Sequence, residues 1–533
     1  MNDLRDSTVL VLGLGDSGLA MARWCAHFGA HVRVWDSRMR EPEGAPQAAA
    51  LAEHVPQAQC IQGPLTKQSL AGVHRVLKSP GLAPGDARIA PLLQQARDAG
   101  IAVQGELDLF NQALRELRVA HGYAPRIVAV TGTNGKTTTT AMTAQLIARA
   151  GKRIAMAGNI GPTMLQTLLD ALAAQAPQQP LGADFIASLP EVWVLELSSF
   201  QLDNVSDFEP DAAALLNITQ DHLDWHGDMA RYEAAKARIF GPRTLRVLNR
   251  DDARVARFAP EPAPAAALRR GAAKVRAVDP PRVVWFGLDA PRRAGDFGLV
   301  TDNAMAWLAR APIGDEPTPK RTGPSAAEVE DLHITHLMPA DALRVRGRHN
   351  AANALAALAL AHAIGCALAP MLHGLREYRG EPHRVEHLGG VEGVDFFDDS
   401  KGTNVGATVA ALSGLGADKA PAKLIVILGG DGKGQDFAPL RDPVQRHARA
   451  VATIGRDAPV IEAALAGLDL AVVRHPTLQA ATRWCFEQAQ RGDAVLLSPA
   501  CASFDMFRNY GHRAEVFTQA YRALAGETGA VIS

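Results

Sequence analysis

Cysteine is scarce in this 533-residue chain, and its few cysteines are scattered. The five positions are Cys25, Cys60, Cys366, Cys485 and Cys501, an odd number with no Cys-x-x-Cys spacing. This pattern predicts reduced thiols and implies neither a disulfide framework nor a cysteine zinc site. A chain of this length can bury enough apolar surface to fold without such cross-links.

Excess charge and long apolar runs are also absent. The chain has 55 Lys and Arg against 56 Asp and Glu, a formal net charge of −1. This balance gives no electrostatic reason to expect nucleic acid or an anionic membrane as a partner. No apolar run approaches the roughly 20 residues that cross a bilayer, and no signal peptide precedes the first strand. We therefore expect a cytoplasmic protein without membrane insertion, and take a monomer as the default.

Apolar runs followed by glycine-rich turns begin three parts of the chain, at residues 9–18, 127–136 and 424–431. Other buried strands are expected at residues 31–35, 192–197, 212–218 and 494–498. Because β runs alternate with Ala/Leu-rich helical patterns, the predicted fold class is α/β. We predict three domains, each a mostly parallel sheet with flanking helices. They are a Rossmann-like domain (1–110), a P-loop ATPase-like domain (111–380) and a second Rossmann-like domain (381–533), with hinges near Phe110 and Gly380.

Residues 252–329 differ from the rest because Pro, Ala and Arg dominate. We expect an irregular insertion on the central domain, with a strand-like island at 282–286 and no chemistry assigned. The segment beginning at Arg348 predicts a capped amphipathic helix. Its polar first turn would either face a ligand or simply cap the helix.

The most informative segment is Arg-Ile-Val-Ala-Val-Thr-Gly-Thr-Asn-Gly-Lys-Thr-Thr-Thr-Thr, residues 126–140. An apolar strand leads into Gly132 and Gly135, and Lys136 then opens a helical pattern. Glycines let backbone N–H groups converge on an anion, and the helix N-terminus and a lysine add positive charge. The strict P-loop has glycine where this chain has Val130, so the match is a shortened variant. The segment predicts a site for ATP phosphates, with the Thr137 hydroxyl available to Mg²⁺.

A second glycine pattern, Gly13, Gly15 and Gly18, matches the dinucleotide fingerprint, and Asp36 ends the next predicted strand. This pattern alone would favour an NAD-dependent oxidoreductase. The same backbone N–H groups can, however, hold any nucleotide diphosphate. A separate phosphate turn about 120 residues later and the lack of an obvious nicotinamide partner favour a non-redox nucleotide.

Candidate metal ligands follow two strands of the central segment. Glu196 ends one strand and could hold Mg²⁺, although it could instead cap a neighbouring helix. Asp221-His-Leu-Asp-Trp-His226 also suggests a metal, and His222 and His226 would suit a zinc pair if the segment were helical. Lys236, taken by itself, would be a surface lysine on a helix.

Several long motifs occur in the order found in one enzyme family. They are Thr131-Gly-Thr-Asn-Gly-Lys-Thr, Gly158-Asn-Ile-Gly, Glu196-Leu-Ser-Ser-Phe-Gln-Leu and Asp221-His-Leu-Asp. Together they resemble the ATP-dependent Mur ligases of peptidoglycan synthesis. Phe397-Asp-Asp-Ser-Lys-Gly-Thr-Asn, Leu428-Gly-Gly-Asp-Gly-Lys and Leu497-Ser-Pro-Ala-Cys-Ala-Ser-Phe-Asp resemble the D-glutamate-adding branch. The resemblance covers nearly the whole chain except the insertion.

The resemblance implies ATP-driven amide formation through an acyl phosphate, with UDP-N-acetylmuramoyl-L-alanine and D-glutamate as substrates. It implies catalytic roles for Lys136, His222 and Lys236. It also implies two Mg²⁺ ions with ligands among Thr137, Glu196, His222 and Lys236, the last carbamylated.

Binding residues are implied position by position. ATP would contact Gly132, Thr133, Asn134, Gly135, Lys136, Thr137, Thr138, Asn350, Asn353, Arg384 and Asp399. The UDP-linked substrate would contact Asp16, Ser17, Asp36, Arg38, Ser79 and Asn159, and D-glutamate would contact Lys401, Thr403, Lys433, Ser503 and the backbone near Phe504. Asp16 departs from the family pattern, because its carboxylate would repel a pyrophosphate. We expect this side chain to point away, or only its N–H to take part.

Three alternatives stay open at this point. One is a sister ligase that adds L-alanine, a diamino acid or a D-Ala-D-Ala dipeptide, or a folylpolyglutamate synthase. The others are the NAD-dependent oxidoreductase and a non-catalytic scaffold that has kept the nucleotide loops.

Overall fold

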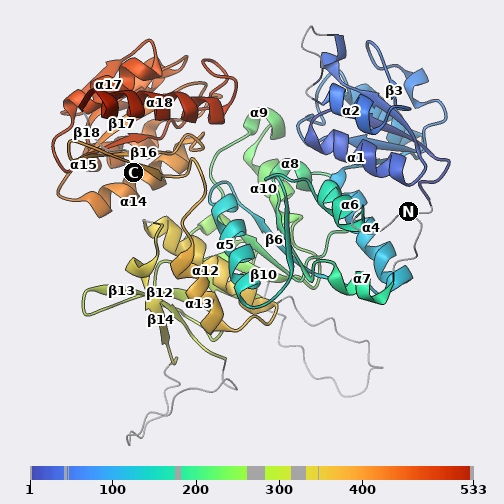
Figure 1. Cartoon of the computed structure of the whole chain (residues 1–533), viewed down its shortest axis with the longest axis horizontal. Coiled ribbons are helices and arrows are strands. Elements are labelled where there is room, and N and C mark those ends of the chain that lie inside the picture. The colour runs from blue at the N-terminus through green and yellow to red at the C-terminus, as the bar shows by residue number, and fades with distance from the viewer. Residues whose placement is uncertain are drawn as a thin grey trace, which may run out of the picture.

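The computed structural model describes residues 3–40, 45, 47–173, 182–260, 282–313, 332–345 and 347–528. Figure 1 shows the N-terminal part (blue) and the C-terminal part (orange to red) on either side of the top of the view, with the central part below them. The short helix α9 (Leu223–His226) points upward between the two. No helix in the described ranges is long and apolar enough to span a membrane.

The N-terminal sheet is parallel and has the order β3-β2-β1-β4-β5. Its strands are β1 (Thr8–Leu12), β2 (His31–Trp35), β3 (Gln59–Cys60), β4 (Arg75–Lys78) and β5 (Ala102–Gln104). The accompanying helices are α1 (Asp16–His27), α2 (Ala48–His54), α3 (Ala90–Asp98), η1 (Ser37–Arg40) and η2 (Lys67–Leu70). The strand order reverses at β1, and ligands of such sheets bind beyond the carboxyl ends of the strands at that point.

Helix α4 (Glu106–His121) joins the first domain to the central one. Phe110 lies inside this helix, has no exposed surface, and meets the Trp193 ring edge-on at 4.8 Å between centroids. One apolar cluster continues from β1 and α1 through α4 into the central sheet. The predicted hinge near Phe110 is therefore wrong, because a helix interior packed in a shared core is not a linker.

The central sheet is also parallel, with the order β11-β10-β9-β6-β8-β7. Its strands are β6 (Arg126–Thr131), β7 (Ile154–Gly158), β8 (Val192–Glu196), β9 (Ala212–Leu215), β10 (Leu245–Asn249) and β11 (Val283–Phe286). The helices are α5 (Lys136–Arg149), α6 (Met164–Ala173), α7 (Ala183–Ser188), α8 (Ser199–Leu202), α9, α10 (Met229–Ala237), α11 (Ala253–Ala256), α12 (Arg348–Ala363) and α13 (Leu368–Glu377). Helices cover both faces, which explains why its strands appear in the sequence as continuous apolar runs.

Two expectations for the central domain need correction. The described part of residues 252–329 is not irregular. Strand β11 joins the central sheet, which agrees with the strand-like island predicted at 282–286. A further antiparallel sheet consists of β12 (Phe297–Asp302), β13 (Met305–Arg310) and β14 (Thr335–Pro339), followed by η3 (Ala340–Ala342). Helix α12 is not amphipathic, since its residues are buried on nearly every side. Its small alanines allow close packing against α5 and the sheet.

The C-terminal sheet has the order β15-β16-β20-β17-β18-β19 and is parallel except for the β15–β16 hairpin. Its strands are β15 (Glu386–Val391), β16 (Val394–Asp398), β17 (Leu424–Gly429), β18 (Ala448–Ile454), β19 (Ala471–Arg474) and β20 (Ala494–Leu497). Its helices are α14 (Val405–Lys419), η4 (Ala438–Leu440), α15 (Arg441–His447), α16 (Ala458–Leu465), α17 (Leu478–Gln488) and α18 (Tyr510–Thr528). The predicted α/β class with three mostly parallel sheets is confirmed.

Candidate active site

The phosphate turn lies between β6 and α5, where the carboxyl end of a central strand meets a helix N-terminus. Asn134 N donates to Asn217 Oδ1 at 2.8 Å, which fixes the turn against the end of β9. Lys136 Nζ donates to the carbonyl oxygens of Gly132 and Thr133 at 2.9 and 2.8 Å. Burial lowers the pKa of Lys136, although the negative charges of nearby acids oppose this shift. The strand, the glycine turn and the helix N-terminus thus follow one another as the sequence predicted, and anion binding by the turn stays a prediction.

A cavity of about 290 Å³ opens beside this turn, between the central and C-terminal domains. Seven of the predicted ATP residues line it: Asn134, Gly135, Thr138, Asn350, Asn353, Arg384 and Asp399. The remaining four, Gly132, Thr133, Lys136 and Thr137, belong to the turn itself or to the first turn of α5. Helix α12 begins after Gly347 without a side-chain cap, and His349, Asn350 and Asn353 near its start line the cavity.

Residues of the C-terminal domain reach into the phosphate turn. Arg384 Nη2 donates to Thr137 Oγ1 at 2.5 Å, while Arg384 Nε is buried without a partner. Asn404, at the start of α14, donates to Asn134 Oδ1 at 3.0 Å and to Asp221 Oδ2 at 3.2 Å. The sequence interpretation missed the roles of Asn404 and Asp221 as links between domains, although both lie in motifs that it quoted.

The carboxylate of Glu196 lies at the end of β8, almost fully buried. Its Oε1 accepts a hydrogen bond from Asn159 Nδ2 at 2.7 Å, while Oε2 is buried with no partner. The following helix, α8, is capped by Ser198, so Glu196 does not serve as its cap. A buried carboxylate oxygen without a donor is costly unless a cation or another donor meets it, so the chemistry of this residue fits a metal ligand.

Lys236 is not the surface lysine that its sequence context suggested. Only 1% of the residue is exposed, and Nζ donates to Gly132 O at 2.7 Å. The ammonium group also lies 4.6 Å from the centroid of the Tyr232 ring. Burial lowers the pKa of Lys236 well below its ordinary value, and the charge of Lys136 lowers it further. The side chain thus enters the phosphate turn from α10 as a readily neutralised amine.

The histidines of the Asp221–His226 segment do not form the zinc pair considered from the sequence. His222 precedes α9 with φ +55°, and its Nε2 lies 3.5 Å from Asp221 Oδ2. His226 Nε2 is hydrogen-bonded to Ser199 Oγ at 2.9 Å. Burial lowers the pKa of each histidine to about 4, so both rings are neutral at pH 7. Neither belongs to a group of three closely spaced metal-ligating side chains in the described ranges.

A second cavity, of about 760 Å³, lies between the first and central domains. All six predicted contacts of the UDP-linked substrate line it: Asp16, Ser17, Asp36, Arg38, Ser79 and Asn159. Asp16 Oδ1 accepts from Gln47 Nε2 at 2.6 Å. Arg88, Thr163, Phe200 and Gln201 also line the cavity and were not predicted. Phe200 and Gln201 belong to the quoted Glu196 motif, whereas nothing in the sequence around Arg88 or Thr163 marked those residues.

A buried glutamate joins the two walls of this second cavity. Glu106 Oε2 accepts from Ser17 Oγ at 2.8 Å, and Oε1 accepts from the Leu165 backbone at 2.9 Å. Burial raises the pKa of this carboxyl, although the hydrogen bonds oppose the shift. Ser17 belongs to α1 and Leu165 to α6, so Glu106 ties the first domain to the central one.

The predicted D-glutamate residues lie at the carboxyl ends of neighbouring strands. Lys401 and Thr403 follow β16, Lys433 follows β17, and Ser503 and Phe504 follow β20. Burial lowers the pKa of Lys401 to about 8, and its Nζ lies 5.4 Å from the centroid of the Tyr510 ring. Ser503 is buried, whereas the Phe504 ring is largely exposed.

Three α/β domains, with one cavity between the first two and another beside the glycine turn between the last two, are typical of a multidomain nucleotide-dependent enzyme. Three family models match: the Mur ligase MurD-like N-terminal domain at residues 7–105, the Mur ligase middle domain at 130–274 and the Mur ligase glutamate ligase domain at 383–501. The chain belongs to the Mur ligase family, as its motifs predicted.

Curated relatives support this family, and solved structures share the fold. The chain is 56% identical over 532 residues to a UDP-N-acetylmuramoylalanine--D-glutamate ligase from Albidiferax ferrireducens, covering 99% of each chain. It is 54% identical to a relative of the same name from Burkholderia pseudomallei, with the same coverage. Among solved structures, UDP-N-acetylmuramate-alanine ligase MurC from Thermotoga maritima is 20% identical with a TM-score of 0.54, covering 97% of this chain and 99% of its own. MurF ligase from Thermotoga maritima, solved in complex with ADP, is 14% identical with a TM-score of 0.53. The match covers 98% of this chain and 100% of the MurF chain.

Proposed function

We propose that this protein is the ATP-dependent ligase that adds D-glutamate to UDP-N-acetylmuramoyl-L-alanine. One structural observation carries the proposal: the phosphate turn is linked to both neighbouring sites. Asn159 of the UDP-substrate cavity hydrogen-bonds Glu196, whose charge acts on Lys136. From the other side, Asn404 bonds Asn134 in the turn. The shared name of the curated relatives supports the choice of substrates.

In the first step, the carboxylate of the L-alanyl group attacks the γ-phosphorus of ATP, and ADP leaves. The product is an acyl phosphate. Lys136 and Arg384 neutralise charge on the transferring phosphoryl group, and the turn amides hold its oxygens. The D-glutamate amine then attacks the acyl carbon and loses a proton, and the C–O bond to phosphate breaks as the tetrahedral intermediate collapses to the amide. The main contribution of the protein is to bring three substrates together in one geometry.

Bound Mg²⁺ would supply positive charge that offsets the charge of the triphosphate. Thr137, Glu196, His222 and Lys236 would hold two such ions. The unpartnered Glu196 Oε2 supports this proposal, and the lowered pKa of His222 leaves its ring nitrogen available as a ligand. Lys236 would take part as a carbamate, since only a neutral amine reacts with CO₂ and burial favours the neutral amine.

D-Glutamate would lie at the strand ends of the C-terminal domain. Its two carboxylates would meet the Lys401 and Lys433 ammonium groups and the hydroxyls of Thr403 and Ser503. UDP would lie in the cavity that Ser17, Asp36 and Ser79 line. The domain boundaries 1–110, 111–380 and 381–533, a cytoplasmic location and a monomeric state remain predictions.

An ADP-release assay with several amino acids tests the proposal. With ATP, Mg²⁺ and UDP-N-acetylmuramoyl-L-alanine, we expect turnover with D-glutamate and none with L-alanine, a diamino acid or D-Ala-D-Ala. Lys136→Ala should lose about a thousandfold or more in turnover, because a charge that acts on the transition state is removed. Lys152→Ala, a change at an exposed lysine beyond the same helix, is the matched control and should retain activity.

Turnover with L-alanine but not with D-glutamate would assign the chain to a sister ligase. Turnover that survives Lys136→Ala unchanged would contradict the role of the phosphate turn. Saturable binding of NADH to the first domain would favour the oxidoreductase alternative.

A further inference from the structure

The turn before β15 holds its backbone in an unusual conformation around Arg384. His383 has φ +63° and Val385 has φ +50°, so non-glycine residues on both sides of the arginine are left-handed. This conformation is unfavourable for a residue with a side chain and persists where the surroundings hold it. The contacts of this turn therefore hold the backbone on both sides of Arg384.

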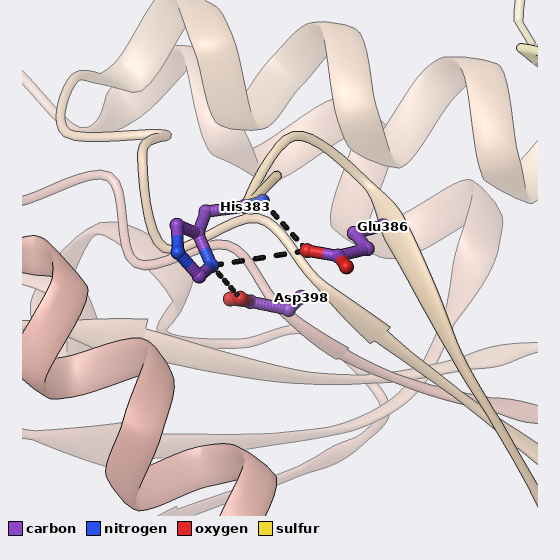
Figure 2. Close-up of side chains that lie close together, drawn as sticks. All are labelled: His383, Glu386 and Asp398. Carbon is purple, nitrogen blue, oxygen red and sulfur yellow. Dashed lines mark hydrogen bonds and ion pairs between the residues drawn. The ribbon is translucent and has the colours of Figure 1, made fainter. Parts of the chain in front are cut away.

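His383 makes three hydrogen bonds that hold the turn in place. Figure 2 shows its ring directed at Asp398, with Nδ1 2.7 Å from Asp398 Oδ2, and its backbone N–H at 2.8 Å from Glu386 Oε2. Its carbonyl oxygen accepts from the Lys401 N–H at 3.2 Å. One residue thus connects the start of β15, the end of β16 and the loop that follows β16.

The partner of this histidine is itself fixed. Asp398 has no exposed surface, and its Oδ1 accepts from Ser400 N at 2.9 Å and from Ser400 Oγ at 2.6 Å. The hydrogen bond to Asp398 raises the pKa of His383, although burial opposes the shift. The ligating atoms of His383, Glu386 and Asp398 lie within 4.8 Å of one another, but His383 Nδ1 is already bonded to Asp398 Oδ2 and Glu386 Oε2 already accepts from the His383 N–H.

Residues next to His383 and Asp398 in the sequence lie at the nucleotide cavity and near the predicted D-glutamate residues. Arg384, next to His383, donates to Thr137 in the phosphate turn. Asp399, next to Asp398, lines the nucleotide cavity and accepts from Ser498 Oγ at 2.6 Å. Lys401, bonded to the His383 carbonyl, lies among the predicted D-glutamate residues. A shift of the His383–Asp398 pair would therefore displace groups at two sites together.

We propose that His383, through its bond to Asp398, is a positioning residue that holds Arg384 at the nucleotide and Lys401 at the amino acid in one geometry. The proposal rests on the proposed function for the identity of the two ligands. It predicts that loss of the ring weakens ATP and D-glutamate together and leaves the UDP-linked substrate unaffected, since that cavity is built from other domains.

Steady-state kinetics of four variants test this. His383→Ala and His383→Gly should each raise the KM for ATP and for D-glutamate about tenfold, with the KM for the UDP-linked substrate within about twofold. Glycine relieves the positive φ but lacks the donor, so its effect separates the ring from the backbone. His383→Asn should bring the KM for ATP and the KM for D-glutamate most of the way back to the wild-type values. Asparagine accepts a left-handed φ and carries a side-chain N–H donor.

His387→Ala is the matched control, because His387 also pairs with an aspartate of β16, Asp395, at 3.3 Å. It should leave all three KM values unchanged. The proposal fails if His383→Gly matches the wild type, if His383→Asn is as impaired as His383→Ala, or if the KM for the UDP-linked substrate rises by the same factor. Calorimetry with a non-hydrolysable ATP analogue requires no turnover. It therefore tests whether the His383 variants bind the nucleotide more weakly, even if D-glutamate proves not to be the substrate.

Discussion

Two lysine ammonium groups meet at one carbonyl oxygen in this protein. Lys136 Nζ and Lys236 Nζ both donate to Gly132 O, at 2.9 and 2.7 Å. Two like charges this close, away from water, are unfavourable, and the pKa of Lys236 falls because of burial and the charge of Lys136. When a neutral Lys236 amine attacks CO₂, a C–N bond forms and a proton is released. The resulting carbamate anion would attract Lys136, which the ammonium group repels.

At the scale of this residue, we expect [¹³C]bicarbonate to label the active enzyme with one carbamate carbon signal in NMR. Lys236→Arg, which keeps a fixed charge and cannot form the carbamate, should lose the signal and reduce turnover about a hundredfold or more. The control variant Lys152→Arg should keep both the carbamate signal and the wild-type turnover. A fully active enzyme prepared without CO₂, with no label after bicarbonate is added, would contradict the carbamate.

Helix α5 shows how an element can depend on its two ends for different reasons. Gly135 precedes it with φ +81°, and a Cβ there would lie 2.6 Å from Asn353 Oδ1. Gly151 follows it with φ +85°, and a Cβ there would meet nothing within 4 Å. Both glycines satisfy a left-handed backbone, but only Gly135 lets the turn approach α12.

We therefore expect Gly151→Ala to cost about 1 kcal/mol of stability, with the KM for ATP unchanged. Gly135→Ala should cost at least as much and also raise the KM for ATP about tenfold or more, because Asn353 must move. Denaturant unfolding and ADP-release kinetics of both variants check this. Equal KM values for ATP in the two variants would show that the close approach to Asn353 is unimportant for nucleotide binding.

At the scale of the whole molecule, the three domains are joined unequally. The first and central domains share an apolar core and the buried Glu106 bonds. In the described part of the chain, hydrogen bonds from Arg384 to Thr137 and from Asn404 to Asn134 link the C-terminal domain to the phosphate turn. Gly380, with φ +96°, lies in the loop between α13 and β15. The predicted hinge at this residue thus remains, and domain closure would involve the C-terminal domain.

Spin-label distances would detect this motion. Cys60 is the exposed native cysteine, and Met305 and Val460 are exposed in the central and C-terminal domains. With Met305→Cys, the distance to Cys60 should be the same with and without an ATP analogue and the UDP-linked substrate. With Cys60→Ser, Met305→Cys and Val460→Cys, we expect the distance distribution to shift or narrow when these ligands bind. Identical distributions in the second pair would rule out closure about Gly380.

Much of this protein could be predicted from neighbouring residues. Apolar runs of residues predict the strands that contain residues 127–130, 192–196 and 424–428. The backbone freedom of glycine predicts the turn that leads to Lys136. Nothing in the sequence predicted the antiparallel sheet of β12, β13 and β14. The prediction of an amphipathic α12 was wrong because a sequence rich in alanine does not reveal whether one side of a helix or all sides are buried.

The sequence by itself determined the α/β class, the phosphate turn, and, through long motifs, the Mur ligase family. Only the tertiary structure decided that Lys236 is buried beside Lys136, that Phe110 lies in a shared core, and that Arg384, next to the His383–Asp398 pair, reaches Thr137. The physical reason is distance along the chain. Burial, and the pKa shifts that follow from it, arise from contacts between residues far apart in sequence, whereas periodicity and turn chemistry arise from adjacent ones.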